Sequence, residues 1–315
     1  MKHEQLCLPE GARLHTAVNR TALSSLSELM HAFEEGLILE AVADRCTSSH
    51  DLLFDLGWTT AVMPRAECAP GLTSGETREI AVLSRVGKPV CFRVAAIDDS
   101  VSPPAVMLSR REVMLETSSY LLDHLLPGEI IHARVTHIEP FGLFVDIGCG
   151  VVSMIGVERL SVSRIFHPSE RFSVGQELLA VVRDIDRATG RINLSHRELL
   201  GTWEENAALF SPGETVRGIV RSVESYGVFI ELTPNLSGLA ERRTGLREGQ
   251  TVSVFVKSIL PERMKLKLNI IDILSETPPA AEAPHYFLSE GRIDRWIYTP
   301  CSCTGKLVET NFTAT

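Results

Sequence analysis

Apolar and polar residues follow two patterns along this chain. Residues 110–126 and 196–210 carry apolar residues at roughly helical spacing, and each stretch ends just before a Pro-Gly pair. Between these stretches lie runs of β-forming residues bounded by turn signals, such as the D-R-A-T-G turn within residues 184–199. Residues 14–34 suggest a further helix. The pattern therefore predicts β units that are joined by short helices.

One β unit occurs more than once. Prolines, glycines and aromatic residues recur at one offset of 85 residues: Pro127-Gly128 with Pro212-Gly213, Phe141-Gly142 with Tyr226-Gly227, and Phe144 with Phe229. Later landmarks keep an offset of 74, as Leu194 does with Leu268. The later copy therefore lacks 11 residues (85 − 74) between its early and late strands. A surface loop of variable length explains the difference.

A weaker copy precedes these two. Phe54-Asp55-Leu56-Gly57 resembles Val145-Asp146-Ile147-Gly148, and in that register the two aromatic positions hold His50 and Leu53. One ring is lost and the other becomes an imidazole. We expect His50 to be structural and this first unit to have a weaker or different role.

The two stronger copies each place two aromatic rings three residues apart beside a glycine. A phenylalanine next to glycine in a strand most often belongs to a core. Rings held in this way on the surface of a small β-barrel would instead form a platform on which nucleic-acid bases stack. The recurrence of the pair in matching units favours the second interpretation.

Composition limits the classes of protein. The chain has 315 residues, of which 44% are hydrophobic and 23% charged, as in globular proteins of two or three domains. No apolar run approaches the ~20 residues that span a bilayer, and the N-terminus lacks an apolar signal segment. Seven cysteines without a framework spacing fit a reducing compartment. We therefore expect a cytoplasmic protein without membrane contact.

The net charge of −9 argues against a protein that coats polyanions non-specifically. Any nucleic-acid contact must come from local basic and aromatic patches.

The fold class that we predict is mainly β, with tandem five-stranded OB-type barrels joined by short helices. The predicted organisation runs from an N-terminal helical extension to a C-terminal linker and tail: residues 1–33 extension, 34–112 degenerate barrel, 113–126 linker helix, 127–197 barrel, 198–211 linker helix, 212–273 barrel, and 274–315 linker and tail. The closing residues should dock on the protein or fold on a partner.

The strong units carry a specific resemblance. The run PG-x5-R-V-x-x-I-x-x-F-G-x-F-V-D-I-G, followed by Gly175-Gln176 and D-I-D-x-x-T-G-R-I-N-L-S, resembles the S1 RNA-binding domain. Over residues 34 to 312 the chain is similar to the short form of bacterial ribosomal protein S1 found in Firmicutes. The narrower likeness rests on four segments: 84–89 (SRVGKP), 201–206 (GTWEEN), 236–241 (LSGLAE) and 296–300 (WIYTP).

The resemblance implies an RNA-binding face in the second unit. The family's two aromatics match Phe141 and Phe144, and its acidic and basic pair near the last hairpin matches Asp186 and Arg191. The loop position, commonly histidine in the family, falls on Arg159. The alternative for Asp186 is that it caps the D-R-A-T-G turn.

The third unit matches with Tyr226, Phe229 and Lys265, and it departs from the family pattern at Glu241 and Leu260. Arg242, Arg243, Lys257 and Lys267 could supply phosphate contacts. The resemblance thus implies a binding face in both units, more complete in the second.

Other chemistry has little support. Cys301-Ser302-Cys303 lacks the second ligand pair of a structural zinc site, and Cys149 between two glycines fits a tight turn. We find no phosphate-binding loop, nucleophile elbow or metalloprotease motif. We therefore expect no metal, cofactor, small-molecule substrate or catalytic activity.

The leading hypothesis is a non-catalytic protein that binds single-stranded RNA or mRNA and acts in translation with the small ribosomal subunit. The alternative is an adaptor whose barrels contact ribosomal or RNA-decay proteins.

Overall fold

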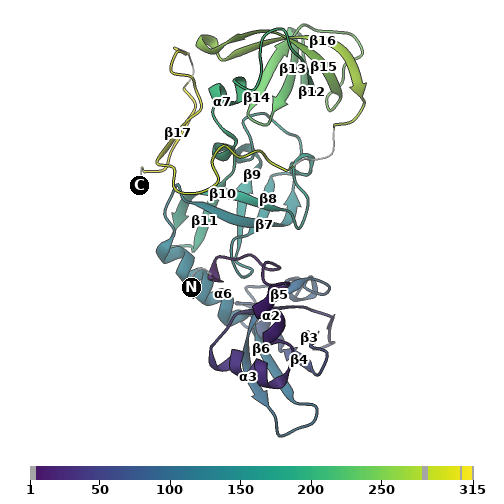
Figure 1. Ribbon diagram of the computed structural model, residues 1–315, viewed down its shortest axis with the longest axis vertical. Coiled ribbons are helices and arrows are strands. Elements are labelled where there is room, and N and C mark those ends of the chain that lie inside the picture. Colours follow the sequence, from purple (N-terminus) through teal and green to yellow (C-terminus); the bar gives the residue numbers. More distant parts are fainter. Residues whose placement is uncertain (1–4, 279–282, 306, 314–315) are drawn as a thin grey trace. The chain divides into compact units, whose positions relative to one another are not determined.

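The computed structural model describes residues 5–278, 283–305 and 307–313 (Figure 1). The chain divides into two compact units. Unit 1 comprises Met1–Leu125, His132–Arg134 and Asp146–Val152; unit 2 comprises Leu126–Ile131, Val135–Val145 and Ser153–Thr315. No helix in the described part of the chain is long and apolar enough to cross a membrane. The fold is mainly β, as the sequence predicts.

The first sheet has six strands in the order β1-β5-β6-β4-β3-β2 and is not a closed barrel. Its strands and small helices are β1 (Leu39–Val42), β2 (Arg45–Cys46), β3 (Leu52–Asp55), β4 (Thr60–Met63), α4 (Arg65–Cys68), α5 (Ile80–Leu83), β5 (Pro89–Asp98) and β6 (Ala105–Ser109). The degenerate barrel that the sequence predicts over residues 34–112 is thus an open six-stranded sheet. Its first strand is broken, because β1 pairs with β5, whereas β2 turns to pair with β3.

The N-terminal extension forms two helices, α2 (Ala17–Ala22) and α3 (Leu26–Glu34), and not the single helix predicted over residues 14–34. The first helix ends at Ala22, and Ser25 begins the second: its backbone is extended and its hydroxyl accepts from the N–H of Glu28 to cap α3.

Cys149 lies in the tight turn that the sequence predicts, within unit 1. It is fully buried and has a positive φ of 44°. Asp146 holds this turn by accepting hydrogen bonds from the N–H groups of Gly148 and Gly150 at 2.8 and 3.1 Å.

A helix precedes the second β unit. It is α6 (Arg111–His124), where the apolar spacing predicts a helix. The strands that follow close a barrel in the order β10-β11-β9-β8-β7. Its elements are β7 (Ile130–Glu139), β8 (Gly142–Asp146), β9 (Val152–Gly156), η1 (Val157–Arg159), η2 (Pro168–Glu170), β10 (Glu177–Asp186) and β11 (Arg191–Ser195).

The third β unit is a second closed barrel, in the order β12-β13-β14-β16-β15. Its elements are β12 (Thr215–Glu224), β13 (Gly227–Thr233), β14 (Leu236–Ala240), β15 (Thr251–Leu260), η4 (Pro261–Arg263) and β16 (Lys265–Ser275). The strand order and pairing repeat those of the second barrel, so the recurring sequence landmarks mark equivalent strands.

The connection between the two barrels is not the continuous helix predicted over residues 198–211. It consists of η3 (Arg197–Leu200) and α7 (Trp203–Ala207). Gly201 lies between them with a φ of 82° and a ψ of 168°, a conformation outside the helical region that glycine adopts without strain. Thr202 then caps α7.

The C-terminal tail docks on unit 2, one of the two outcomes that the sequence left open. Strands β17 (Arg295–Ile297) and β18 (Glu309–Asn311) pair with each other. Trp296, Tyr298 and Phe312 are buried in the hydrophobic core that unit 2 shares between its barrels and tail. Part of the predicted linker, residues 279–282, lies outside the described residues.

Candidate nucleic-acid interface

Each closed barrel carries an aromatic pair of the same geometry. Phe141 and Phe144 meet edge to face with ring centroids 6.0 Å apart and planes at 88°. Tyr226 and Phe229 do the same at 6.2 Å and 88°. The first ring of each pair is exposed, at 55% for Phe141 and 69% for Tyr226. We call these pairs the second-barrel and third-barrel platforms.

A glycine directs the exposed ring outward in each platform. A side chain on Gly142 would place its Cβ 2.4 Å from the carbonyl oxygen of Ile155, and one on Gly227 would lie 2.8 Å from that of Ala240. The strand therefore starts against its neighbour at a point where only glycine fits. The preceding aromatic residue, in the turn, is left exposed, whereas Phe144 and Phe229 lie half-buried within their strands.

The other predicted residues of the second barrel have differing roles. Arg159 lies in η1 and is 23% exposed; burial, and then the charges of Arg183 and Arg197, lower the pKa of its guanidinium. Arg191 is exposed and pairs in register with Asp186 at the end of the β10–β11 hairpin.

Asp186 caps its turn, the alternative that the sequence left open. Its carboxylate accepts from the Thr189 hydroxyl at 2.6 Å and from the N–H groups of Ala188 and Thr189 at 3.0 and 3.2 Å. These bonds, the hydroxyl first, lower the pKa of Asp186.

The third-barrel platform opens onto a basic groove. A hollow of about 660 Å³ is lined by Tyr226, Phe229 and three lysines, Lys257, Lys265 and Lys267. Lys257 also lines an adjoining hollow of about 430 Å³ together with Arg242 and Arg243. Glu241 borders both hollows. Every site residue predicted for the third barrel therefore lies along one groove, which also takes in Arg263.

Strand pairing adds residues that sequence reasoning missed. In the third barrel, Phe229 pairs with Ser222 and with Leu239. The offset of 85 places His137, Phe144 and Met154 at the equivalent positions of the second barrel, where they begin a row across the strands that continues to Asn193 and Asp184, from β7 to β10. The rings of His137 and Phe144 are 6.3 Å apart, Met154 pairs with Asn193, and Asn193 pairs with Asp184. Asn193 donates from Nδ2 to Asp184 Oδ1 at 2.6 Å. This row surrounds the platform with hydrogen-bonding groups.

The equivalent row of the third barrel is Ser222, Phe229, Leu239, Lys267 and Ser258, as the pairing of β12, β13, β14, β16 and β15 shows. Lysine here replaces the amide, and a hydroxyl replaces the carboxylate.

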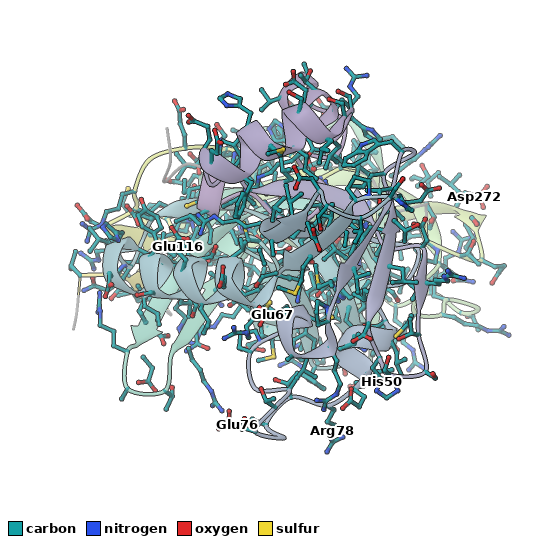
Figure 2. All side chains as sticks on the ribbon, turned by 90° about the horizontal axis from the view of Figure 1, so that it is seen from below. His50, Glu67, Glu76, Arg78, Glu116 and Asp272 are labelled. Atoms are coloured by element: carbon teal, nitrogen blue, oxygen red, sulfur yellow. The ribbon has the colours of Figure 1, made fainter. Side chains whose placement is uncertain are left out.

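In the first sheet the same row is mostly apolar: Arg45, Leu53, Val62, Met107 and Ala96. Met107 is 40% exposed. His50, labelled in Figure 2, stands at the position that the exposed ring of Phe141 has in the second barrel. Its Nδ1 lies 3.0 Å from Oε2 of Glu79. The expectation that His50 is structural agrees with this contact.

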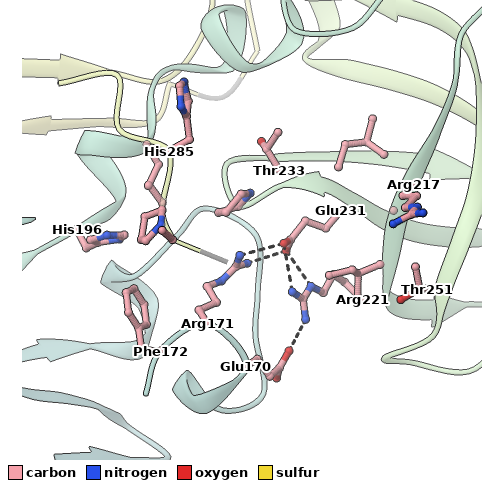
Figure 3. Close-up of a pocket in the computed structure, with 17 residues that line it drawn as sticks. Glu170, Arg171, Phe172, His196, Arg217, Arg221, Glu231, Thr233, Thr251 and His285 are labelled. Atoms are coloured by element: carbon pink, nitrogen blue, oxygen red, sulfur yellow. Dashed lines mark hydrogen bonds and ion pairs between the residues drawn. The ribbon is translucent and has the colours of Figure 1, made fainter. Parts of the chain in front are cut away.

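A third hollow, of about 380 Å³, lies within unit 2 (Figure 3). Arg171 of the second barrel and Arg221 of the third converge on Glu231 at 2.7 and 2.8 Å, and Arg221 also pairs with Glu170. All of these side chains are at least four-fifths buried. The shared carboxylate connects the two barrels.

His196 is buried beside this network. Its Nδ1 lies 2.9 Å from the Leu160 carbonyl oxygen and its Nε2 3.2 Å from the Tyr286 hydroxyl. Burial lowers the pKa of the imidazole to about 4, so the ring is neutral near pH 7.

Within the described residues, no three histidine, cysteine or acidic side chains are placed to hold a metal ion. Cys301 is exposed and Cys303 half-buried, both as free thiols.

Comparison with known proteins places this geometry in context. Residues 126–197 match the family described as the S1 RNA binding domain. Over 200 residues the chain is 32% identical to small ribosomal subunit protein bS1 of Staphylococcus aureus strain N315, which covers 58% of this chain and 50% of that protein. Over 210 residues it is 31% identical to the bS1 homolog of Bacillus subtilis strain 168, covering 62% and 54%.

The chain thus spans about half the length of the curated relatives that it matches. A solved structure from Streptococcus pneumoniae, described as a multidomain protein with nucleic acid binding domains, is 15% identical over 75% of this chain and 74% of that one, with a TM-score of 0.24.

Proposed function

We propose that this chain, a homologue of the S1-type ribosomal proteins, binds single-stranded RNA without reacting with it and acts in translation with the small ribosomal subunit. The observation that carries the proposal is the pair of exposed aromatic platforms, which have the same edge-to-face geometry on two barrels.

Stacking accounts for a preference for single strands. Bases of a single strand expose their faces, and Phe141 and Tyr226 offer exposed rings on which a base can stack. Such stacking is worth about 1–3 kcal/mol per base and tolerates any base. A duplex keeps its bases stacked on one another and offers the rings no comparable contact.

Local charge supports the same proposal in spite of the net charge of −9. Lys257, Lys265 and Lys267 line the groove at the third platform. Arginine and lysine side chains neutralise backbone phosphates, so the strand would follow this groove while its bases stack on the rings.

Two platforms in one compact unit would act together. The second and third barrels share a hydrophobic core and the buried network around Glu231. Once one platform holds a strand, binding at the other becomes intramolecular, which raises avidity by about 100-fold or more when the strand reaches both.

The names of the relatives support a role with the small ribosomal subunit. From that role we infer messenger RNA as the ligand and the cytoplasm as the location. Sedimentation of the protein with small ribosomal subunits, beside crosslinking and sequencing of bound RNA in cells, tests this part. Absence from both the ribosomal and the RNA fractions would contradict it.

The RNA-binding claim is tested by the double substitution Phe141→Ala and Phe144→Ala. Titration of labelled single-stranded RNA should show at least a ~10-fold loss of affinity, about 1.4 kcal/mol, because the stacking surface is removed while the barrel core remains.

Phe166→Ala is the matched control. Phe166 is 66% exposed in the same barrel, in the segment that holds Glu170 at the buried network. The Phe166→Ala variant should bind single-stranded RNA with the same affinity as the unchanged protein. Equal affinity of the double variant and the unchanged protein would overturn the role of the second platform.

The adaptor alternative has one observation in its favour, the apolar row of the first sheet, in which Met107 is 40% exposed. Salt separates the two functions. RNA affinity should fall steeply as salt rises, because phosphate contacts release counterions, whereas an apolar protein contact should change little.

A further inference from the structure

We propose that the second barrel selects adenine through Asn193, whereas the third barrel binds the strand without choosing between bases. The inference rests on the proposed function, since it assigns a base preference to one of the two platforms.

The Asn193 amide has a fixed orientation. Along β11, Ile192 and Leu194 are buried, so the intervening Asn193 lies on the outer face of the barrel. Its Nδ2 lies 2.6 Å from Asp184 Oδ1. A carboxylate only accepts hydrogen bonds, so the nitrogen of the amide must face it. Among the described residues, no hydrogen bond uses Asn193 Oδ1 or the second N–H.

Asn193 also lies within reach of a base on the second-barrel platform. Met154 lies on β9, between Phe144 on β8 and Asn193 on β11. Neighbouring strands are about 4.8 Å apart, which puts Asn193 roughly 10 Å from Phe144 along the row. A base that stacks on Phe144 and extends over Met154, itself 38% exposed, therefore brings its edge to the amide.

The free groups of the amide are complementary to one edge of adenine. With one N–H and one carbonyl oxygen remaining, the amide matches the Hoogsteen edge of adenine, which is the one base that offers a donor beside an acceptor on that edge. Asparagine pairs in this way with N6 and N7 of adenine. The Asp184 carboxylate holds the amide for that contact and is a positioning group.

The equivalent row of the third barrel lacks the pair of amide and carboxylate. Both closing hairpins have the same register shift, between Val182 and Asp184 and between Val256 and Ser258. On that common backbone, Lys267 and Ser258 replace the amide and the carboxylate. An ammonium group donates to any acceptor, phosphates included, and so gives affinity with little choice between bases.

The test uses the full chain with the third platform removed by Tyr226→Ala and Phe229→Ala, so that the second barrel binds alone. Labelled oligoadenylate and oligouridylate of equal length are titrated. This parent should prefer oligoadenylate by at least about fivefold. Adding Asp184→Ser and Asn193→Lys, which installs the row of the third barrel, should bring the two affinities within about twofold.

The reciprocal graft guards against misfolding. In a chain that lacks the second platform (Phe141→Ala, Phe144→Ala), Ser258→Asp with Lys267→Asn should create a preference for oligoadenylate on the third barrel. Three results would each overturn the proposal. The parent with only the second platform could show no preference for oligoadenylate, it could keep its preference after Asp184→Ser and Asn193→Lys, or the graft on the third barrel could gain no preference. A parent that binds no oligomer would overturn the RNA-binding role of the second platform as well, whereas a parent that binds both equally overturns the inference alone.

Discussion

At the scale of residues, the platforms depend on one local feature each, the glycine that follows the exposed ring. Gly142 and Gly227 allow the strand to approach its neighbour so closely that any Cβ would meet a backbone oxygen. The ring before the glycine is exposed as a result, and the ring two positions after it is half-buried in the strand. This is why an aromatic-glycine pair recurs with the unit.

These rings could be predicted from sequence because they recur at one offset with the turn residues that position them. The hydrogen bond between Asn193 and Asp184 could not. This bond joins the neighbouring strands β10 and β11 beside a register shift. The sequence of either strand alone does not show which residues a bulge brings opposite each other. The signal that existed was the offset of 74, which aligns Asn193 with Lys267 and Asp184 with Ser258.

His196 should make stability depend on pH. Burial lowers its pKa to about 4 in the folded state, below its ordinary value of about 6.5. Between these values the unfolded chain binds more protons, so the free energy of unfolding falls as pH decreases from 6.5 toward 4.

Comparison with His196→Gln isolates this effect from the other titrating groups. The stability difference between the two proteins should shrink by about 2 kcal/mol from pH 7 to pH 5, because only the unchanged protein has to keep this buried imidazole neutral. Denaturant unfolding at both pH values measures it. A difference that does not change with pH would show that His196 keeps an ordinary pKa.

At the scale of elements, equivalent strands carry different chemistry in the three units. The row across the strands is polar and amide-bearing in the second barrel, basic in the third and mostly apolar in the first sheet. A conserved backbone with changed side chains is how one fold supports several binding tasks. The two departures that the sequence showed in the third unit, Glu241 and Leu260, are accompanied there by lysines along the groove.

The lysines of that groove should set much of the salt dependence. Replacing Lys257, Lys265 and Lys267 with glutamine removes three phosphate contacts, each of which releases about 0.7 counterions from a single strand. The slope of log affinity against log salt should become shallower by about 2. Binding measured at four or five potassium chloride concentrations gives the slope.

Arg20→Gln is the matched control, because Arg20 is exposed on α2 and outside the groove. Its slope should equal that of the unchanged protein. If the triple variant kept the slope of the unchanged protein, the RNA would not contact the phosphate-binding lysines of this groove.

The elements that sequence misjudged share a cause. Residues 196–210 and 14–34 have helical apolar spacing, yet each is divided where a residue suits a helix end better than a helix interior, at Gly201 and at Ser25. The spacing of the apolar residues indicates only which side of each segment is buried. Whether the backbone continues as one helix depends on tertiary contacts, here those of Trp203 and Leu199 in the core of unit 2.

At the scale of the molecule, the acidic residue that follows the aromatic pair ties each barrel to another segment. Asp146 accepts from the backbone N–H of Glu10 within unit 1, at 2.8 Å. Glu231, at the equivalent position of the third barrel, binds Arg171 of the second. Each of the two barrels thus carries a point of assembly as well as an aromatic platform.

Glu231→Gln should weaken the coupling of the second and third barrels. It leaves Arg171 and Arg221 buried without their shared carboxylate, a change of the kind that costs about 3–5 kcal/mol. Calorimetry should show the unfolding of unit 2 broaden or divide into two transitions. Glu224→Gln, at an exposed position on β12, should leave the transition unchanged. A single transition of unchanged midpoint in Glu231→Gln would show that the network is not what couples the barrels.

The measurement that tests the central claim most directly is the mapping of RNA on the protein. Single-stranded RNA bound to the full chain is crosslinked with ultraviolet light, and the modified peptides are identified by mass spectrometry. The crosslinks should fall on Phe141 and Phe144 and on Tyr226 and Phe229, because bases stacked on these rings lie in direct contact with them. Crosslinks confined to the first sheet or to the tail, with both platforms unmodified, would contradict the account.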